Sequence, residues 1–567
     1  MKKANGCYTL YGNSISRSQS RAVERWQKMF IRKFSYDPDE QYHLGIEENP
    51  YLGPVFGLKN IVRKDGAGNL GGRPRGHKAN HHRADHRADN KAGDPGDALG
   101  SAPHGNSSAG LADLAGDPGN TPVSLCPSEL NSPEAVIIST IRMGFGHYRI
   151  AMAGASAAAA MGFTPYWLDL LTIPGITSDV INWCNTWYSR WSRISQKSTF
   201  FDKYIWEAVT TGEATLPGLS GLLNSWIVAW PWRFLKTNIK DYKMSELFGP
   251  LHRSLPPNIP ILTAHMWNCM GAVAGGMKNV VDMMFDNWPM AFQLTEGAKH
   301  AVQSPSGYYG FRTMRGFNEK GKILKPLPQD AIHYTGHHVD HELVENIEID
   351  CAARLERMKA GEPRRFLVTM GGAGAQRELF HAVIEHCIPL IKQNKLTLYV
   401  NLGDHRDNWD WLGSQLSSHR DLIRTHFTWD DAKQYADHIR NESTKGLHVF
   451  LFDNIFHAVY ASNYLMRVVD VMITKPSELA FYPVPKIFNA RVGGHEKWGA
   501  IRGAEIGDGT VETRTIAQTL EAVDLLTNED DLLQLYCSQI VKNKQIGIYD
   551  GAYKSVELAT GKAFERG

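Results

Sequence analysis

Beyond residue 134, apolar residues fall into short continuous runs, and each run is followed by a longer segment that favours a helix. Runs of this kind are typical of strands that are buried in a parallel sheet. Three candidate strands lie in the first half and five in the second: AVIISTI, PYWLDLL and IPILTAH, then RFLVTMGG, LTLYVNLG, HVFLFDN, DVMITK and PKIFNA. The pattern predicts an α/β protein with two doubly wound, Rossmann-like domains, and we expect the ligand site in the cleft between them.

We expect six consecutive regions along the chain. They are an N-terminal extension (1–62), a linker (63–130), a first Rossmann-like domain with an aromatic-rich insertion (131–335), an interdomain crossing (336–365), a second Rossmann-like domain (366–545) and a C-terminal tail (546–567). The linker is rich in Gly, Asp, Ala, Asn, Pro and His and nearly lacks aromatic and β-branched residues. Because it buries too little apolar surface to offset its chain entropy, we expect it to be disordered.

Charge and cysteine content narrow the classes of function. Lys and Arg number 61 and Asp and Glu 59, which leaves a net charge of +2 and gives no indication of a nucleic-acid partner. The seven cysteines are scattered without a C-x-x-C pair, and no apolar run is long enough for a signal peptide or a membrane span. These features predict a cytoplasmic protein that does not cross a membrane.

Two features raise the question of contact with a membrane surface. The segment Ser16–Phe34 is predicted to form a basic amphipathic helix, which either lies on an anionic membrane or docks on the main body with its charges in solvent. A belt of tryptophans in the first domain either lies at a membrane interface, where it would take a lipid acceptor, or forms the core of an insertion. The belt consists of Trp167, Trp183, Trp187, Trp191, Trp206, Trp226, Trp230 and Trp232.

A glycine turn follows the first candidate strand. Gly144 and Gly146 remove the Cβ atoms that would keep a ligand away from the backbone, and the helix that follows directs its first amides toward the turn. His147 lies at this turn, and a histidine there suits proton transfer. The alternative is a tight strand-to-helix connection with a capping histidine.

A second glycine turn repeats this design in the second domain, and a carboxylate follows another strand end there. Gly371, Gly372 and Gly374 end a candidate strand ahead of a predicted helix. Glu478 follows another strand end, where it either binds a diol such as ribose or complements the dipole of a helix. The remaining candidates on this side are Thr474, Lys475, Ser477, His495 and Glu496.

Taken together, these motifs resemble the GT-B glycosyltransferase superfamily, and within it the monogalactosyldiacylglycerol synthases, the processive diacylglycerol glucosyltransferases and the lipid II N-acetylglucosaminyltransferase. The first turn resembles the family's G-G-x-G-H turn, and Gly371–Gly374 resembles its donor-domain glycine turn. Thr474–Glu478 resembles the T-K-P…S/T-E element, and 493–499 resembles the P-G-Q-E-x-x-N loop. Here Ser477 follows Pro476 directly, so the loop that lies against the donor diphosphate in the family is absent, and His495 and Gly499 replace the family's Gln and Asn.

The resemblance implies transfer of a sugar, with inversion, from a nucleoside-diphosphate donor, expected to be UDP-linked, to a lipid or small-molecule acceptor. It implies that His147 is the catalytic base and that Gly144 and Gly146 border the acceptor. The implied donor-binding residues are Gly371, Gly372, Gly374, Thr474, Lys475, Ser477, Glu478, His495 and Glu496. No cofactor and no tightly held metal are implied, and no D-x-D-like cluster stands beside the expected diphosphate.

Two other functions are compatible with the same architecture. A nucleotide-sugar 2-epimerase would act on the donor alone, without an acceptor. A degenerate relative would bind a nucleotide or a lipid without catalysis.

Overall fold

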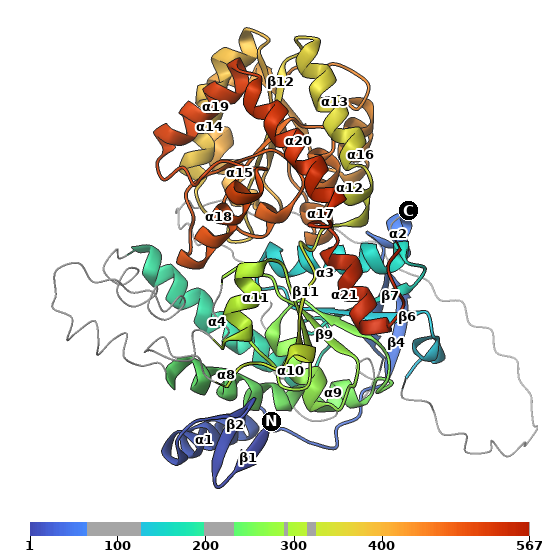
Figure 1. The fold of residues 1–567 in the computed structure, drawn as a ribbon. Helices are drawn as coiled ribbons and strands as arrows, with labels where there is room; N and C mark the ends of the chain where they lie inside the picture. Colours follow the sequence, from blue (N-terminus) through green and yellow to red (C-terminus); the bar gives the residue numbers. More distant parts are fainter. Residues whose placement is uncertain (65–125, 198–231, 289–292, 315–324, 566–567) are drawn as a thin grey trace, which may run out of the picture. The chain divides into compact units, whose positions relative to one another are not determined.

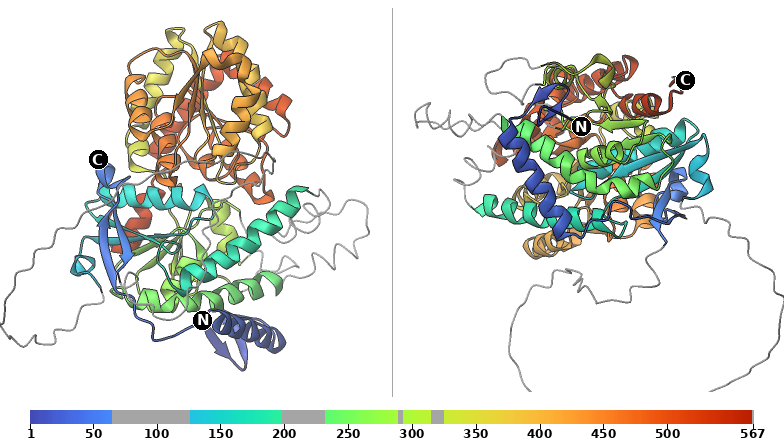
Figure 2. Two further views of the ribbon diagram at one scale, coloured as in Figure 1. Left: turned by 180° about the vertical axis from the view of Figure 1, so that it is seen from behind. Right: turned by 90° about the horizontal axis from the view of Figure 1, so that it is seen from below.

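The structure is a computed structural model that describes residues 1–64, 126–197, 232–288, 293–314 and 325–565 (Figure 1). Most of the predicted linker (65–125) and a large part of the predicted aromatic insertion (198–231) lie outside the described residues. The described chain contains two large sheets with helices packed along them (Figure 2).

The first domain is built on an eight-stranded sheet. Its neighbouring strands are parallel except for the antiparallel pair at one edge, β4 and β5. The order is β11 (Ile332–Tyr334), β10 (Lys299–Val302), β9 (Val280–Met283), β8 (Ile261–Thr263), β6 (Ala135–Thr140), β7 (Thr164–Asp169), β5 (Lys59–Arg63) and β4 (Leu44–Glu48). The three strands expected in the first half are therefore confirmed as β6, β7 and β8.

The N-terminal extension contributes to this domain. Its strands β4 and β5 extend the large sheet, and a separate small sheet contains β1 (Lys2–Ala4), β2 (Cys7–Leu10) and β3 (Asn13–Ser14). The predicted amphipathic helix forms as α1 (Arg17–Lys33), which starts with a capping box between Ser16 and Gln19. Val23 and Phe30 are buried where α1 packs on α8 (Trp232–Ser245), so its apolar side is used inside the protein.

The second domain is built on a six-stranded, fully parallel sheet. Its order is β14 (Ile423–His426), β15 (Gly446–Phe450), β13 (Leu396–Asn401), β12 (Arg364–Thr369), β16 (Val471–Thr474) and β17 (Lys486–Phe488). All five strands expected in the second half are confirmed. Two doubly wound α/β domains, the predicted fold class, are thus what the chain forms.

Helices connect and cover the strands. Those of the first domain are α2 (Gly53–Phe56), α3 (Phe145–Ala160), α4 (Ile176–Lys197), α9 (Gly249–Arg253), α10 (Met266–Ala274) and α11 (Pro305–Arg312). Those that follow the first sheet are α12 (His341–Glu345), α13 (Ile347–Lys359), α14 (Arg377–Lys392), α15 (Arg406–Gln415), α16 (Trp429–His438), α17 (Ile455–Met466), α18 (Lys497–Ile506), α19 (Ile516–Asn528), α20 (Asp531–Gln545) and α21 (Gly551–Thr560). Short 3-10 turns lie at Ser128–Asn131, Glu246–Phe248, Gln329–Ala331, Ser417–Leu422, Glu478–Phe481 and Gly494–Glu496.

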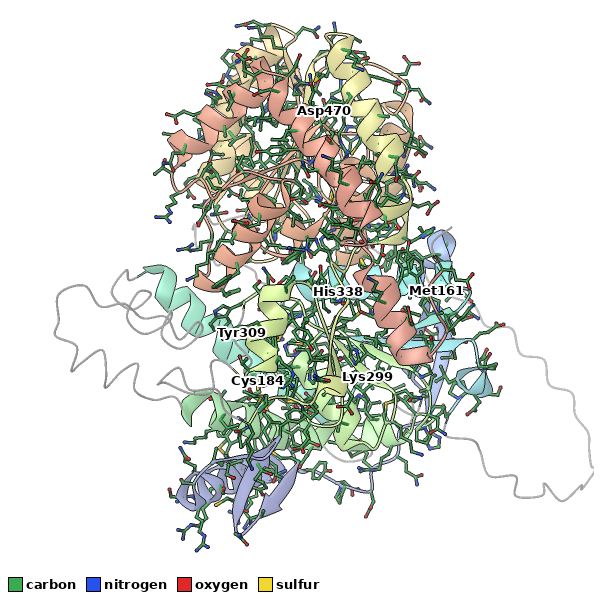
Figure 3. All side chains as sticks on the ribbon, viewed as in Figure 1. Met161, Cys184, Lys299, Tyr309, His338 and Asp470 are labelled. Atoms are coloured by element: carbon green, nitrogen blue, oxygen red, sulfur yellow. The ribbon has the colours of Figure 1, made fainter. Side chains whose placement is uncertain are left out.

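The chain crosses between the domains twice. The amide of His337 donates to the carbonyl of Ile548 at 2.6 Å, and the amide of Gly551 donates to the carbonyl of His337 at 2.9 Å. His338, labelled in Figure 3, is buried at this double crossing. The segment predicted as a C-terminal tail contains α21, which packs on α3 and on β8, β9 and β10 of the first domain (Figure 1).

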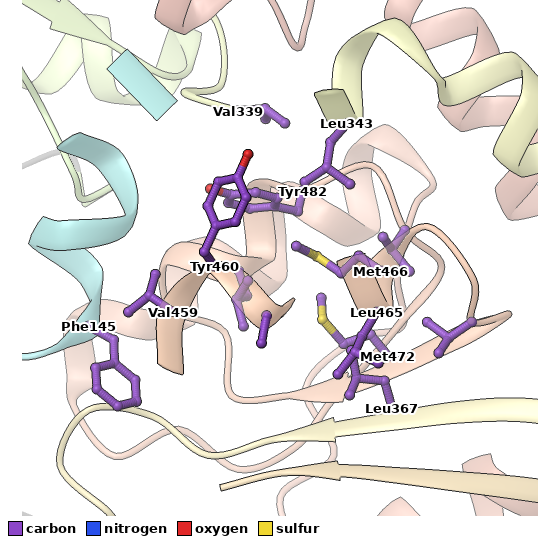
Figure 4. Close-up of a cluster of buried hydrophobic side chains, with 14 of the residues drawn as sticks. Phe145, Val339, Leu343, Leu367, Val459, Tyr460, Leu465, Met466, Met472 and Tyr482 are labelled. Carbon is purple, nitrogen blue, oxygen red and sulfur yellow. The ribbon is translucent and has the colours of Figure 1, made fainter. Parts of the chain in front are cut away.

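A continuous hydrophobic cluster joins the two domains. Phe145 of α3 lies near Val459 and Tyr460 of α17, and Val339 of the crossing segment lies above Tyr460 and Tyr482 (Figure 4). Burial of this shared apolar surface stabilises the contact between the domains, since it is removed from water only when they meet.

Candidate functional site

Strand order places one topological switch point in each sheet. In the first sheet the chain runs from β6 to β7 on one side and then to β8 on the other, and in the second sheet β12 is flanked by β13 and β16 in the same way. Ligands of doubly wound sheets bind at the carboxyl ends of the strands at such points. The predicted turn Gly144–His147 follows β6, Gly371–Gly374 follows β12, and Lys475 follows β16.

His147 is held across the first switch point. Its Nδ1 lies 2.7 Å from the carbonyl oxygen of Ala264, the residue that follows β8. A carbonyl only accepts, so Nδ1 donates the hydrogen bond, and Nε2 of the neutral ring keeps its lone pair. Burial lowers the pKa of His147, while the Ala264 hydrogen bond and the charge of Glu478 oppose the shift. The ring is therefore a neutral base at pH 7, with Nε2 as the basic atom.

Aromatic groups fix the plane of this imidazole. The rings of His265 and Phe285 pack edge-on against His147, with centroids 4.7 and 4.5 Å away. His265 caps α10 by accepting a hydrogen bond from the amide of Trp267 at 3.1 Å. Sequence reasoning missed both neighbours as site residues: His265 ends the predicted strand segment IPILTAH without a glycine turn beside it, and Phe285 follows β9, a strand that was not predicted.

The two glycine turns touch each other. A Cβ atom on Gly372 would lie 2.3 Å from the backbone nitrogen of Phe145, the first residue of α3. A Cβ on Gly371 would lie 2.7 Å from Cε of Lys475. Gly144 has a φ of 146°, which favours glycine. The backbone of the second turn therefore packs directly on the start of α3, and the space between the turns is filled by protein atoms.

A charged cluster lies beside this contact. Lys475 and Glu496 form an ion pair, and the second oxygen of Glu496 accepts hydrogen bonds from the amides of Val492 and Gly493 at 2.8 and 3.2 Å. Burial lowers the pKa of Lys475, but Glu496, Glu478 and Asp286 oppose burial and the net shift is upward. Both oxygens of Glu496 are thus engaged within the protein.

Glu478 joins the two domains at the site. A Cβ on Gly146 would lie 3.2 Å from its Oε2, so the carboxylate rests on the first turn of α3. The residue opens the 3-10 turn Glu478–Phe481, as the sequence indicated, with Ser477 at the preceding position. The predicted acceptor side (Gly146, His147) and the predicted donor side (Glu478) therefore meet.

Other predicted donor residues lie at the margin of this contact. Gly374 faces His405 and Asn408 rather than the first domain. Thr474 is buried in the sheet, where it accepts a hydrogen bond from the Thr369 hydroxyl at 3.2 Å. His495 lies beside Trp288, with ring centroids 6.4 Å apart.

Asp286 belongs to the same cluster and was not predicted. It follows β9, and its pKa is raised by burial and by Glu496 and Glu478, while His495 and Lys475 oppose the shift. The adjacent Asn287 donates to the carbonyl of Trp498 in the second domain at 3.0 Å. Asp286 follows a strand end, as the glycine turns do, but Asp282 interrupts the apolar residues of β9, so no continuous apolar run marks this strand in the sequence.

Further contacts hold the domains together around the site. Arg142, in the loop before Gly144, forms an ion pair with Asp404 of the second domain. Arg149 of α3 is 3% exposed and donates to Asn463 Oδ1 at 3.1 Å and to the Val459 carbonyl at 3.0 Å, both on α17. Neither arginine stood out in the sequence.

The described part of the chain contains neither a metal-binding cluster nor a membrane-spanning helix. Among these residues, no three His, Cys, Asp or Glu side chains are grouped so as to hold a metal ion. Likewise, none of the described helices combines the length and the apolar character needed to cross a bilayer. The seven cysteines, all of them within the described ranges, are free thiols.

The architecture and the site define a two-domain α/β protein whose switch points face each other. By sequence, the chain belongs to the family described as domain of unknown function DUF6937, whose model matches residues 9–313. The model described as domain of unknown function DUF6938 matches residues 327–560. No curated protein matches the sequence.

Three solved structures with similar folds carry UDP in their names. The UDP-GlcNAc 2-epimerase from Neisseria meningitidis bound to UDP-GlcNAc is similar at 9% identity and a TM-score of 0.38, over 75% of this chain and 97% of that one. The S. aureus MnaA–UDP co-structure is similar at 10% identity and a TM-score of 0.37, over 75% and 94%. The α,α-trehalose-phosphate synthase (UDP-forming) from Burkholderia vietnamiensis is similar at 10% identity and a TM-score of 0.35, over 75% and 97%.

Proposed function

We propose that the protein is a glycosyltransferase of the GT-B type that moves a sugar from a nucleoside-diphosphate donor, expected to be UDP-linked, to an acceptor hydroxyl with inversion. The observation that carries the proposal is the meeting of the two glycine turns beside His147, whose Nε2 is kept available by the 2.7 Å contact between Nδ1 and Ala264. A base next to backbone free of side chains suits an attacking hydroxyl and an activated sugar.

In the proposed reaction the acceptor oxygen attacks the anomeric carbon, and the bond from that carbon to the diphosphate oxygen breaks. The electron pair leaves with the diphosphate, and the acceptor proton passes to Nε2 of His147. Glu478, whose charge raises the pKa of His147 against the effect of burial, stabilises the imidazolium that forms. In this proposal Lys475, which lies against Gly371, balances the charge of the leaving diphosphate.

Binding requires the two turns to separate. Because the backbone of Gly372 packs on Phe145, a diphosphate fits between the turns only when the domains move apart there. Closure around a bound donor would then exclude water and strengthen the charge interactions.

A nucleotide panel tests the proposal. We expect a UDP-sugar to raise the midpoint of thermal unfolding, with a gain of about 2.7 kcal/mol at a hundredfold excess over the dissociation constant. Transfer to an added acceptor separates a transferase from an epimerase, which consumes none. The absence of stabilisation by every UDP, GDP and TDP compound would reject the proposal.

We further propose that the acceptor is a lipid and that the exposed face of α1 holds the protein on the membrane that contains it. Arg21, Arg25, Lys28 and Arg32 recur at helical spacing on this face and are exposed, while the opposite side of α1 is buried on α8. Glu24, at the margin of the face, is paired with Lys3. The docked helix thus offers its charges, rather than its apolar side, to an anionic surface.

Vesicle co-sedimentation tests this contact. Vesicles that contain phosphatidylserine should bind the protein, and phosphatidylcholine vesicles should not. The double variant Arg25→Glu/Arg32→Glu should lose binding, because each basic residue near such a surface contributes about 1 kcal/mol. Lys392→Glu/Lys395→Glu, at exposed positions of the second domain, is the matched control. Equal losses in the two double variants would argue against a role for α1.

A further inference from the structure

A small cavity lies between the domains, next to the contact of the glycine turns. Its lining includes Arg149, Gly371, Asn401, Lys475, Ser477 and Glu478. It has room for about one water molecule in this structure. The cavity therefore lies where β12 and β16 end, at the switch point of the second sheet.

One donor in the wall of this cavity is unsatisfied. Arg149 is 3% exposed, and its two terminal nitrogens donate to Asn463 and Val459 of α17. Its Nε–H has no hydrogen-bond partner among the described residues. A buried guanidinium N–H without an acceptor costs free energy, which a bound acceptor of opposite charge would recover.

Two cations and one carboxylate face the cavity itself, and further carboxylates lie close to both cations, Asp340 near Arg149 and Asp286 near Lys475, so an anionic ligand competes with them. Arg149 and Lys475 contribute two positive charges to the lining, and Glu478 contributes one negative charge. Glu496 lies outside the lining and forms an ion pair with Lys475. Gly371 presents backbone without a Cβ, so a ligand can approach the main chain closely.

We propose that this cavity widens into the phosphate subsite when the two turns separate, and that Arg149 of the first domain then binds the donor diphosphate through its Nε–H, together with Lys475. This inference rests on the proposed function. It adds Arg149, which no sequence motif indicated, to the residues that bind the donor. It also accounts for the direct succession of Pro476 and Ser477, because a cation from the opposite domain takes over the contact that the absent loop would make.

Pyrophosphate and UDP are the probes, each titrated by calorimetry and by thermal unfolding against the full-length protein. Arg149→Lys keeps the charge but removes the Nε–H, and it should weaken binding of both probes about tenfold or more, the effect of losing a charge-assisted hydrogen bond. Arg440→Lys, on the surface of the second domain, should leave binding unchanged.

A second variant separates ligand binding from domain anchoring. Asn463→Ala removes the partner of one terminal nitrogen of Arg149 but leaves Nε in place. Binding retained within about threefold in Asn463→Ala, with the loss seen in Arg149→Lys, supports the subsite. Equal losses in both variants would assign Arg149 to anchoring alone and overturn the inference.

Two outcomes distinguish this inference from the proposed function. If the wild type binds UDP and Arg149→Lys binds it equally well, the phosphate subsite is wrong while the proposed function stands. If the wild type binds neither UDP nor pyrophosphate, both are wrong.

Discussion

Gly372 of the second domain lies directly against Phe145 of the first, so close that a Cβ atom on Gly372 would come within 2.3 Å of the Phe145 nitrogen. The position of a Cβ is fixed by the backbone and the Phe145 nitrogen belongs to the main chain, so neither a rotamer change nor a flexible side chain relieves the overlap. The contact therefore exists only because residue 372 is a glycine.

Gly372→Ala should force the two turns apart. We expect a loss of about 1–3 kcal/mol in unfolding free energy, the usual cost of overpacking, together with weakened binding of the donor nucleotide. Urea unfolding and nucleotide titration measure the two effects. The control is Gly413→Ala in α15, where the nearest atom outside the helix backbone lies 4.0 Å from the new Cβ and where alanine should stabilise the helix by about 0.5–1 kcal/mol. A Gly372→Ala variant as stable as this control would show that the turns do not pack in solution.

His147 should set the acid limb of the pH profile. A base acts when unprotonated, and burial lowers the pKa of His147 from 6.5, so kcat/KM should remain at its plateau down to a pH below 6.5 and fall only beneath it. His147→Ala should lower kcat by about 10²–10⁴-fold and remove this limb. His438→Ala, exposed at the end of α16, is the control, and an acid limb that persists in His147→Ala would assign the base elsewhere.

The strands that sequence patterns missed are short, polar or at an edge. β14 carries Arg424 and Thr425 among its four residues and is an edge strand, so no apolar run marks it. β10 contains a buried histidine, His300, which satisfies both ring nitrogens through contacts that no local pattern reveals. Strands β4 and β5 form an antiparallel edge pair with exposed polar positions, and they escaped detection for the same reason.

The residues of the candidate site likewise fall into two groups, those that local sequence patterns reveal and those that they do not. Glycine turns after buried strands are visible in the sequence because they combine two local signals. Arg149 is not visible, since its partner Val459 lies 310 residues away and the helix around it is rich in small residues that suggest close packing rather than a binding site. Asp286 is likewise not visible, because it joins the charged cluster only when Lys475 and Glu496 of the second domain approach it. Long-range packing, rather than propensity, places these two side chains.

Asp286→Asn should stabilise the protein at neutral pH. Burial and two nearby carboxylates raise the pKa of Asp286 above 3.8, so ionisation costs more in the folded state than in the unfolded state. The gain should be full above the folded pKa and should fade as the pH falls through it, until below 3.8 the carboxyl is protonated in both states. Urea unfolding at pH 7 and pH 4 measures it, with Asp330→Asn, exposed ahead of β11, as control. Destabilisation at pH 7 would mean that a structural partner holds Asp286.

His300 should make the fold sensitive to acid. Its Nδ1 donates to the Ala331 carbonyl at 2.8 Å and its Nε2 accepts from the Thr295 amide at 3.0 Å, so protonation of Nε2 breaks a buried hydrogen bond. Burial lowers the pKa of His300 to about 4, below the 6.5 of the unfolded chain. The unfolded state therefore binds the proton first, and stability is lost as the pH falls from 6.5 toward 4, by about 2 kcal/mol at pH 5 for this one residue.

The slope of the unfolding free energy against pH measures this acid sensitivity. Unfolding free energies between pH 7.5 and 4.5 give the slope, and His300→Gln should reduce the slope by about one proton while lowering stability at pH 7.5, because the amide reproduces the two ring hydrogen bonds imperfectly. His252, His338 and His448 contribute in the same direction, since burial lowers their pKa values to about 4, 3 and 4. The wild-type slope should therefore exceed that of a single histidine, and a His300→Gln slope equal to that of the wild type would show that His300 is already protonated, or accessible to water, in the folded protein.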